Sequence, residues 1–151
     1  MTPEPRTAPP IALVGLMGAG KSAVTRALGE RLAVAVLDLD AALEAEAGCT
    51  VAEWFARRGE ASFRAREREL LARAADGPAG VIACGGGVVI EAGNRTVLRE
   101  RFRTVWLEIS PGAAARRVGA GAERPVLGPG PAQQRLATLL AERAAWYGEV
   151  A

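Results

Sequence analysis

The segment that most constrains this chain is the glycine-rich run GLMGAGKS at residues 15–22. It fits the pattern G-x-x-x-x-G-K-[ST] at every specified position, and the apolar run at residues 11–14 precedes it. Val24, Leu28 and Leu32 then recur at helical spacing. This order of strand, glycine loop and helix predicts a phosphate-binding loop (P-loop), with backbone N–H groups and the positive helix end facing the phosphates. The alternative is a glycine-rich turn before an ordinary helix, which this context disfavours.

Lys21 is the only lysine among 19 basic residues, and all the others are arginines. A compact ammonium reaches the outer phosphates of a nucleotide, where a planar guanidinium fits poorly. We therefore expect Lys21 to act through its charge on the phosphates. The residues expected to bind the nucleotide in this loop are Gly18, Ala19, Gly20, Lys21, Ser22 and Ala23.

Composition excludes several classes of function. The chain has no histidine, which removes histidine-based catalysis and histidine metal ligands. A net charge of +2 is too small to indicate binding to nucleic acid, and no apolar stretch approaches the ~20 residues that span a bilayer. Cys49 and Cys84 lack metal-site spacing. Two free thiols fit a cytoplasmic protein, and we expect a monomer with small-molecule ligands.

Apolar segments alternate with helical patterns, which predicts an α/β fold with a central parallel sheet and helices on both faces. Residues 1–10 contain four prolines and are expected to be a disordered lead, and residues 11–151 are expected to form one domain. Strands are expected at residues 11–14, 35–39, 80–84 and 104–109. Helices are expected at residues 21–33, 40–47, 51–58, 60–75, 91–101, 111–118 and 132–147.

Residues 119–131 contain four glycines and three prolines and cannot continue either flanking helix. A loop of this length in a compact domain is often a lid over a binding site, and an ordinary connection is the alternative. Arg116, Arg117 and Arg124 flank this segment or lie in it. Arginines in a lid can close over a transferring phosphoryl group, although simple solvation remains an alternative for Arg116.

Two of the three aspartates, Asp38 and Asp40, end the second predicted strand. Alternation along a strand would direct both carboxylates to one side, toward the crevice at the carboxyl end of a parallel sheet. One could hold Mg²⁺ and the other could position or deprotonate an attacking hydroxyl. The alternative is that Asp40 only caps the following helix, and the residues alone leave both interpretations open.

Charged residues also occur on helix faces that are otherwise apolar. Glu67 lies on the stripe of a predicted helix, with Arg64 three residues earlier and within ion-pair reach. Arg143 follows leucines at helical spacing in the last helix. A charge on a buried face needs a partner or a ligand, such as a substrate carboxylate for Arg143. Pairing in solvent, or snorkelling of the long side chain, is the alternative.

Three successive glycines, Gly85, Gly86 and Gly87, follow the third predicted strand. Successive glycines cost conformational entropy and are usually kept where the backbone turns sharply or approaches a ligand closely. We therefore place this run at the binding site.

Together these segments resemble shikimate kinase, a small P-loop kinase of aromatic amino-acid biosynthesis. The resemblance covers residues 11 to about 150, with the elements in the family's order. It rests on GLMGAGKS at 15–22, LDLD at 37–40, GEASFR at 59–64 with Glu67, the glycines at 85–87, VWLEI at 105–109, RPVL at 124–127, and Arg143 with Tyr147. It implies a three-layer P-loop fold with strand order 2-3-1-4-5, whose fifth strand we expect to be absent from this chain.

The resemblance also implies a reaction in which ATP phosphorylates the 3-hydroxyl of shikimate, with Mg²⁺ as cofactor. Lys21 would stabilise the migrating phosphoryl group. Ser22 would ligate Mg²⁺ with Asp38 in its outer shell. Asp40 would bind the ring hydroxyls and is the candidate base.

The remaining roles implied by the resemblance concern the carboxylate and the adenine. Arg64 and Arg143 would clamp the substrate carboxylate beside the glycine run, where Gly86 would offer its N–H. Arg124 would close with the lid, and Arg117 would lie against the adenine. The alternatives are a related kinase, acting on gluconate or a nucleoside monophosphate, and an inactive protein that only binds nucleotide or shikimate.

Overall fold

The computed structural model describes residues 7–118 and 131–151. Within them, four parallel strands form one sheet in the order β2-β3-β1-β4. The strands are β1 (Ile11–Val14), β2 (Val36–Asp38), β3 (Val81–Ala83) and β4 (Arg103–Trp106). The α/β class and the first four positions of the expected strand order are therefore confirmed.

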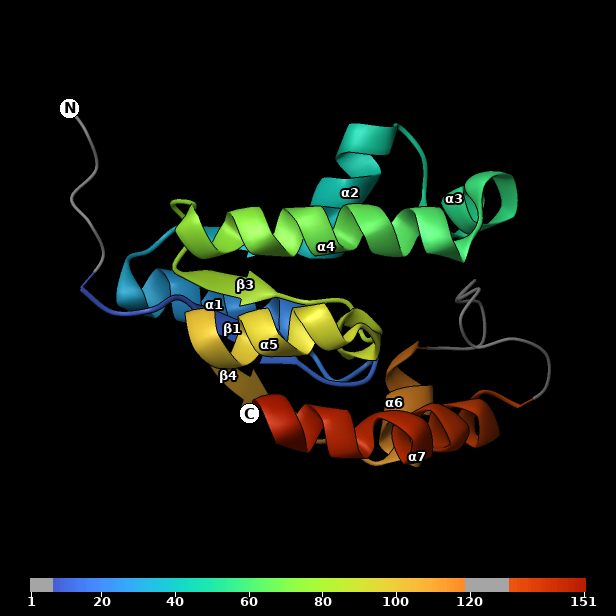
Figure 1. Ribbon diagram of the computed structural model, residues 1–151. Helices are drawn as coiled ribbons and strands as arrows, with labels where there is room; N and C mark the ends of the chain where they lie inside the picture. Colours follow the sequence, from blue (N-terminus) through green and yellow to red (C-terminus); the bar gives the residue numbers. More distant parts are fainter. Residues whose placement is uncertain (1–6, 119–130) are drawn as a thin grey trace.

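Helices cover both faces of the sheet, and in Figure 1 α1 lies behind the sheet while α5 lies in front of it. The helices are α1 (Lys21–Leu32), α2 (Leu39–Ala47), α3 (Val51–Arg58), α4 (Glu60–Asp76), η1 (a 3-10 turn, Val88–Ile90), α5 (Ala92–Arg101), α6 (Pro111–Val118) and α7 (Ala132–Val150). The expected bounds of α3 and α6 are confirmed, and the η1 turn was not predicted.

The main hydrophobic core lies on the face of the sheet covered by α4, α5 and α7. It joins Ala12 and Ile82 of the strands to Leu71 of α4, Leu98 of α5 and Tyr147 of α7. Because side chains alternate along a strand, the neighbouring positions of β1 and β3 point to the opposite face, toward α1. A smaller cluster of Leu43, Trp54 and Phe63 joins α2, α3 and α4 above the carboxyl end of the sheet.

The face that α1 presents to the sheet differs from the predicted stripe. Val24 and Leu28 are only partly buried and Leu32 is 51% exposed, whereas Thr25 and Gly29 are buried. A Cβ on Gly29 would overlap the side chain of Val36 in β2. Small residues therefore allow close approach of this helix to the sheet, which a search for large apolar residues misses.

The second strand ends one residue earlier than predicted, and this changes the reading of the two aspartates. Asp38 is the last residue of β2 and the N-cap of α2, where its Oδ1 accepts a hydrogen bond from the Ala41 N–H at 3.1 Å. Asp40 lies in the first turn of α2. The capping residue is therefore Asp38. The alternative that Asp40 is only a cap is wrong, and so is the placement of Asp40 by strand alternation.

Other boundaries shift by a few residues. β4 ends at Trp106 and not at residue 109, and α7 continues to Val150, beyond the predicted end at residue 147. The predicted lid at 119–131 falls almost wholly outside the described residues. So does most of the predicted lead, although Pro10 is buried and its carbonyl accepts a hydrogen bond from the Arg103 N–H. In residues 7–118 and 131–151, no helix is long and apolar enough to cross a membrane.

Candidate active site

The glycine loop after β1 adopts a conformation that requires its glycines. Gly15, Gly18 and Gly20 have φ values of 145°, 82° and 90°, in the region that favours glycine. A Cβ on Gly15 would also lie 2.6 Å from the Leu107 carbonyl oxygen, and one on Gly18 would lie 2.8 Å from that of Ala114. The loop is therefore held tightly against the segments that follow β4 and against α6.

Lys21 begins α1 at the end of this loop, with Gly20 as the N-cap. Its Nζ donates hydrogen bonds to the carbonyl oxygens of Gly15 at 2.6 Å and Leu16 at 2.8 Å. No acidic residue occupies the first turn of α1. The positive helix end and the ammonium therefore make this loop a site for anionic phosphate groups.

Ser22 and Asp38 lie beside the loop and contact each other. The Ser22 hydroxyl donates a hydrogen bond to Asp38 Oδ2 at 2.6 Å. Among residues 7–118 and 131–151, no three His, Cys, Asp or Glu side chains gather into a metal-binding group. A hydroxyl and one carboxylate form a partial oxygen set, which suits a Mg²⁺ ion that takes its other ligands from phosphates and water.

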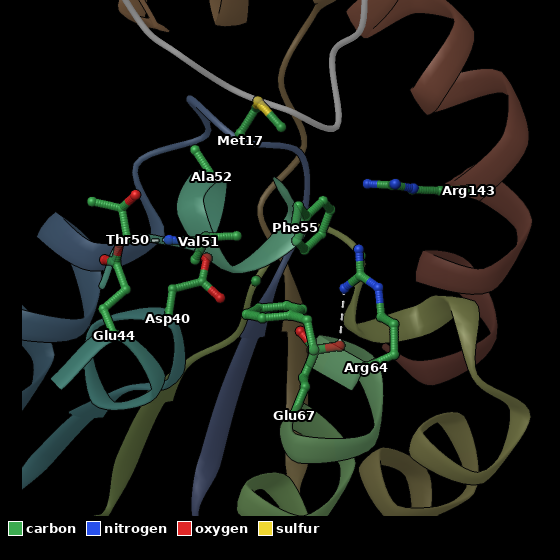
Figure 2. Close-up of a pocket in the computed structure, with 14 residues that line it drawn as sticks. Met17, Asp40, Glu44, Thr50, Val51, Ala52, Phe55, Arg64, Glu67 and Arg143 are labelled. Atoms are coloured by element: carbon green, nitrogen blue, oxygen red, sulfur yellow. Dashed lines mark hydrogen bonds and ion pairs between the residues drawn. The ribbon is translucent and has the colours of Figure 1, made fainter. Parts of the chain in front are cut away.

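A cavity of ≈ 290 Å³ opens next to the loop, between α2, α3, α4 and α7 (Figure 2). It brings together the predicted substrate-binding residues from four separate segments of the chain. Its lining residues are Met17, Asp40, Glu44, Thr50, Val51, Ala52, Phe55, Phe63, Arg64, Glu67, Gly85, Gly86, Gly87 and Arg143. Figure 2 shows the Arg64 and Arg143 guanidiniums on one side of the cavity and the Asp40 carboxylate on the other.

The Asp40 carboxylate lines this cavity. Its Oδ1 is buried and has no hydrogen-bond partner among the described residues. Burial raises the pKa of Asp40, and the nearby Asp38 charge raises it further, whereas Lys21 and Arg64 lower it. Asp40 is therefore a carboxylate with an unused acceptor, a raised pKa and an ammonium nearby, which are the properties of a general base for a hydroxyl.

Arg64 is held by two glutamates of its own helix. Its Nη1 donates to Glu67 Oε1 at 3.0 Å, and its Nη2 pairs with Glu60 Oε1 at 3.2 Å. Glu67 is 0% exposed, and its Oε2 has no partner among the described residues. Burial raises the pKa of Glu67 to about 7 despite the opposing charge of Arg64. The ion pair predicted from the i, i+3 spacing is confirmed.

Arg143 reaches the cavity from α7. Arg143 is buried, and its Nη1 lies near Gly86, at 3.6 Å from the position that a Cβ on Gly86 would take. Tyr147, one helical turn later, donates a hydrogen bond from its hydroxyl to the Gly86 carbonyl at 2.6 Å. The side chain expected to point at a substrate carboxylate therefore enters the same cavity as Arg64.

The glycine run is needed because side chains of the site press against it. A Cβ on Gly85 would lie 2.8 Å from Asp40 Oδ1, and one on Gly87 would overlap the Arg64 guanidinium. Neither glycine has a φ in the left-handed region. These two glycines thus make room for the side chains of Asp40 and Arg64.

The predictions for the arginines expected to act on the nucleotide have different outcomes. Arg117 Nη1 donates a hydrogen bond to the Ala19 carbonyl at 3.3 Å, so its guanidinium lies over the P-loop. Arg116 is exposed. Arg124 lies outside the described residues, and its role stays a prediction.

Several residues that line the cavity were missed by sequence reasoning. Phe55 packs edge-to-face with Phe63 at 5.2 Å between centroids, and so forms an apolar wall of the cavity next to Arg64, whose Cζ lies 6.0 Å from the Phe55 ring centroid. Glu44 follows Asp40 by one helical turn and lines the same cavity. The i, i+4 spacing from Asp40 could have identified Glu44 from the sequence. Met17 stands at an unspecified position of the loop pattern, so no local signal marked it.

The comparisons with known proteins agree on one family. The family model described as shikimate kinase matches residues 17–151. A shikimate kinase of Symbiobacterium thermophilum is 48% identical and covers 93% of this chain and 82% of its own length. One of Frankia casuarinae is 46% identical and covers 93% of this chain and 62% of its own length.

Solved structures point the same way. A shikimate kinase from Acinetobacter baumannii in complex with shikimate matches with a TM-score of 0.92 at 39% identity, over 96% of this chain and 81% of that one. A gluconokinase from Sinorhizobium meliloti has a TM-score of 0.52 at 21% identity, which shows a shared fold alone. Residues 17–151 match the family model and close relatives cover most of the chain, so this chain belongs to the shikimate kinase family.

Proposed function

We propose that this chain transfers the γ-phosphoryl group of ATP to the 3-hydroxyl of shikimate. The observation that carries the proposal is a single cavity with a buried, unpartnered carboxylate oxygen at Asp40 and two buried guanidiniums, those of Arg64 and Arg143. Shikimate offers the matching groups, a set of ring hydroxyls and one carboxylate. The P-loop beside the cavity supplies the place for the phosphates.

Recognition of the acid depends on Arg64 and Arg143. A guanidinium matches the geometry of a carboxylate and binds it through two parallel hydrogen bonds. Glu60 and Glu67 pair with Arg64, whereas Arg143 forms no ion pair within residues 7–118 and 131–151. An anion that binds both guanidiniums would therefore offset a buried charge that the described residues leave without an ion pair. The apolar wall around Phe55 gives the carbon ring of the substrate a surface to pack on.

Asp40 acts as the base in this proposal. The hydroxyl oxygen of the substrate attacks the γ-phosphorus, the bond from that phosphorus to the leaving oxygen of ADP breaks, and the hydroxyl proton passes to Asp40 Oδ1. A raised pKa suits this step, because a base works best when its pKa lies nearer the working pH. Lys21 stabilises the charge on the phosphoryl group during transfer.

The remaining nucleotide contacts follow from the loop. The N–H groups of the P-loop cradle the phosphates, and Arg117 lies where it can cover the nucleotide. Ser22 and Asp38 would hold Mg²⁺, the hydroxyl directly and the carboxylate through water. When bound, the ion neutralises charge on the phosphate oxygens.

The proposal is tested by an assay of ADP release with shikimate, gluconate, AMP and CMP as separate acceptors. We expect turnover with shikimate alone, and none in Lys21→Met. Turnover of gluconate but not shikimate would assign the chain to a different reaction. Binding of shikimate in a titration, with no phosphorylated product from ATP and Mg²⁺, would leave a binding protein and remove the proposed activity.

A further inference from the structure

Tyr147 connects α7 to the glycine run through one short hydrogen bond. Its side chain is buried, and its hydroxyl donates to the Gly86 carbonyl oxygen at 2.6 Å. The ring is held independently by Trp106 of β4, with centroids 5.6 Å apart. Packing in the core therefore accounts for the aromatic ring, and the hydroxyl needs an explanation of its own.

The Arg143 guanidinium, one turn earlier in α7, reaches the same glycine, since its Nη1 lies 3.6 Å from the position a Cβ would take on Gly86. A phenol has one donor and two acceptor positions, so the hydroxyl that donates to Gly86 keeps its acceptor positions for a guanidinium beside it. Gly86 in turn lies against the P-loop, since a Cβ there would be 3.5 Å from both the Gly15 carbonyl oxygen and the Met17 nitrogen. The Tyr147 hydroxyl and the Arg143 guanidinium therefore meet at one backbone segment of the cavity.

We propose that Tyr147 is a positioning residue for the substrate carboxylate, which aims the Arg143 guanidinium and fixes the Gly86 peptide through its hydroxyl group. This inference rests on the proposed function of the cavity. Arginine has several rotatable bonds, and a fixed acceptor beside it restricts them before the acid binds. Less conformational entropy is then lost on binding. The Gly86 peptide cannot rotate without losing its donor, because a buried carbonyl without a partner is unfavourable.

Tyr147→Phe tests this by removing only the hydroxyl. We expect the KM for shikimate to rise about tenfold, on the scale of one lost hydrogen bond to a charged group, while kcat and the KM for ATP stay within about twofold. A matched control is Thr138→Val, which removes an exposed hydroxyl of the same helix that donates to the Gln134 carbonyl at 3.0 Å. A lower melting temperature with an unchanged KM for shikimate would reduce Tyr147 to a structural role.

A double-mutant cycle with Arg143→Ala tests the route through the arginine. If Tyr147 acts by aiming Arg143, the double variant should lose little more shikimate affinity than Arg143→Ala alone. If the effects of Tyr147→Phe and Arg143→Ala on shikimate affinity are fully additive, Tyr147 does not act through Arg143.

Tyr147 is the only tyrosine of the chain. Replacing tyrosine throughout with 3-fluorotyrosine therefore labels this one site and keeps its hydroxyl, which preserves the test if Tyr147→Phe does not fold. We expect the ¹⁹F resonance to move on adding shikimate, and less on adding ADP. An unmoved resonance in a protein that binds shikimate by calorimetry would overturn the inference. This readout needs no turnover, so it is separate from a failure of the proposed reaction, which the unmodified chain reports by its lack of product.

Discussion

Two of the carboxyl groups that line the cavity, those of Asp40 and Glu67, have raised pKa values. Burial is the largest cause of the raised pKa in both, and Arg64 opposes it in both. Arg64 contacts Glu67 directly, at 3.0 Å. Glu67 therefore holds this cation in place together with Glu60, and Asp40 keeps a free acceptor atom for a ligand.

Asp40→Asn should lower kcat by about 10²- to 10⁴-fold, the usual contribution of a positioned base. Shikimate should still bind, because Arg64 and Arg143 are unchanged. Steady-state kinetics with a binding titration measures both quantities. Asp76→Asn is the control, since Asp76 is exposed and pairs with Arg101. Turnover close to that of the unmodified chain would remove Asp40 from the chemistry.

Glu67 predicts a specific dependence of stability on pH. Its pKa is raised from 4.5 to about 7 in the folded state, so between these values the folded protein binds more protons than the unfolded chain. The free energy of unfolding should therefore fall as pH rises from about 4.5 to 7, by about 3 kcal/mol at 1.36 kcal/mol per unit. Glu67→Gln should remove this part of the slope in urea titrations at several pH values.

A change at an exposed glutamate provides the control for that measurement. Glu142→Gln, on the outer side of α7, should keep the slope of the unmodified chain. An identical slope in Glu67→Gln would show that Glu67 is not the group that titrates.

Sequence reasoning found the charged residues of the site because they interrupt apolar stripes. Arg64 and Arg143 stand out on such faces, and Lys21 stands out as the single lysine. The division of roles between Asp38 and Asp40 depended on the residue at which β2 ends, and strand ends leave little signal in a sequence. Phe55 was missed because an aromatic residue in a short helix usually belongs to a core.

At the level of elements, the end of α7 is fixed by a charged contact with α5. Glu149 pairs with Arg95 at 2.7 Å and with Arg99 at 2.9 Å. Arg95 also lies over the Trp146 ring at 5.0 Å and donates to the Val89 carbonyl of η1 at 2.8 Å. This contact joins the helix that carries Arg143 to the turn that follows the glycine run.

Glu149→Ala should therefore destabilise the fold, by about 1 kcal/mol because the three side chains are partly exposed and such pairs are screened by solvent. The melting temperature should fall by about 2–4 °C in a domain of this size. Glu142→Ala removes a glutamate of the same helix that has no ion pair within the described residues. Equal losses in both variants, measured by thermal unfolding, would show that the contact with α5 contributes nothing.

Helix and strand positions were predictable to within a few residues where the pattern was strong. The bounds of β1 and α6 agree with the sequence pattern. The contact face of α1 was not predictable, because Gly29 packs by allowing close approach and not by burying a side chain of its own. The end of α7 was missed because Val150 continues its buried face past the predicted end at Tyr147.

At the scale of the whole molecule, parallel strands place the site. The P-loop follows β1, Asp38 and Asp40 stand at the end of β2, and the glycine run follows β3, so all three meet at the carboxyl edge of the sheet. α4 and α7 then bring one arginine each, Arg64 and Arg143, to the cavity (Figure 2). Alternating patterns predicted a parallel sheet, but the strand order came from the family resemblance, because pattern alone does not fix which strands are neighbours.

Binding of shikimate should stabilise the whole fold, since its carboxylate offsets charge between two elements that are far apart in sequence. At a concentration about 100 times the Kd, the gain is about 2.7 kcal/mol, which corresponds to a rise in melting temperature of about 5–10 °C. Differential scanning fluorimetry with shikimate and gluconate in parallel measures it. An equal rise with gluconate would contradict a cavity selective for shikimate.

The close packing around Gly85 and Gly87 has a consequence for inherited variation. A methyl group on Gly85 would push aside the Asp40 carboxylate, the proposed acceptor of the proton, and one on Gly87 would push aside the Arg64 guanidinium, which is proposed to bind the substrate carboxylate. In a screen of random variants, substitutions at these two glycines should therefore have different effects. Gly85→Ala should slow the chemical step, and Gly87→Ala should weaken binding of the substrate.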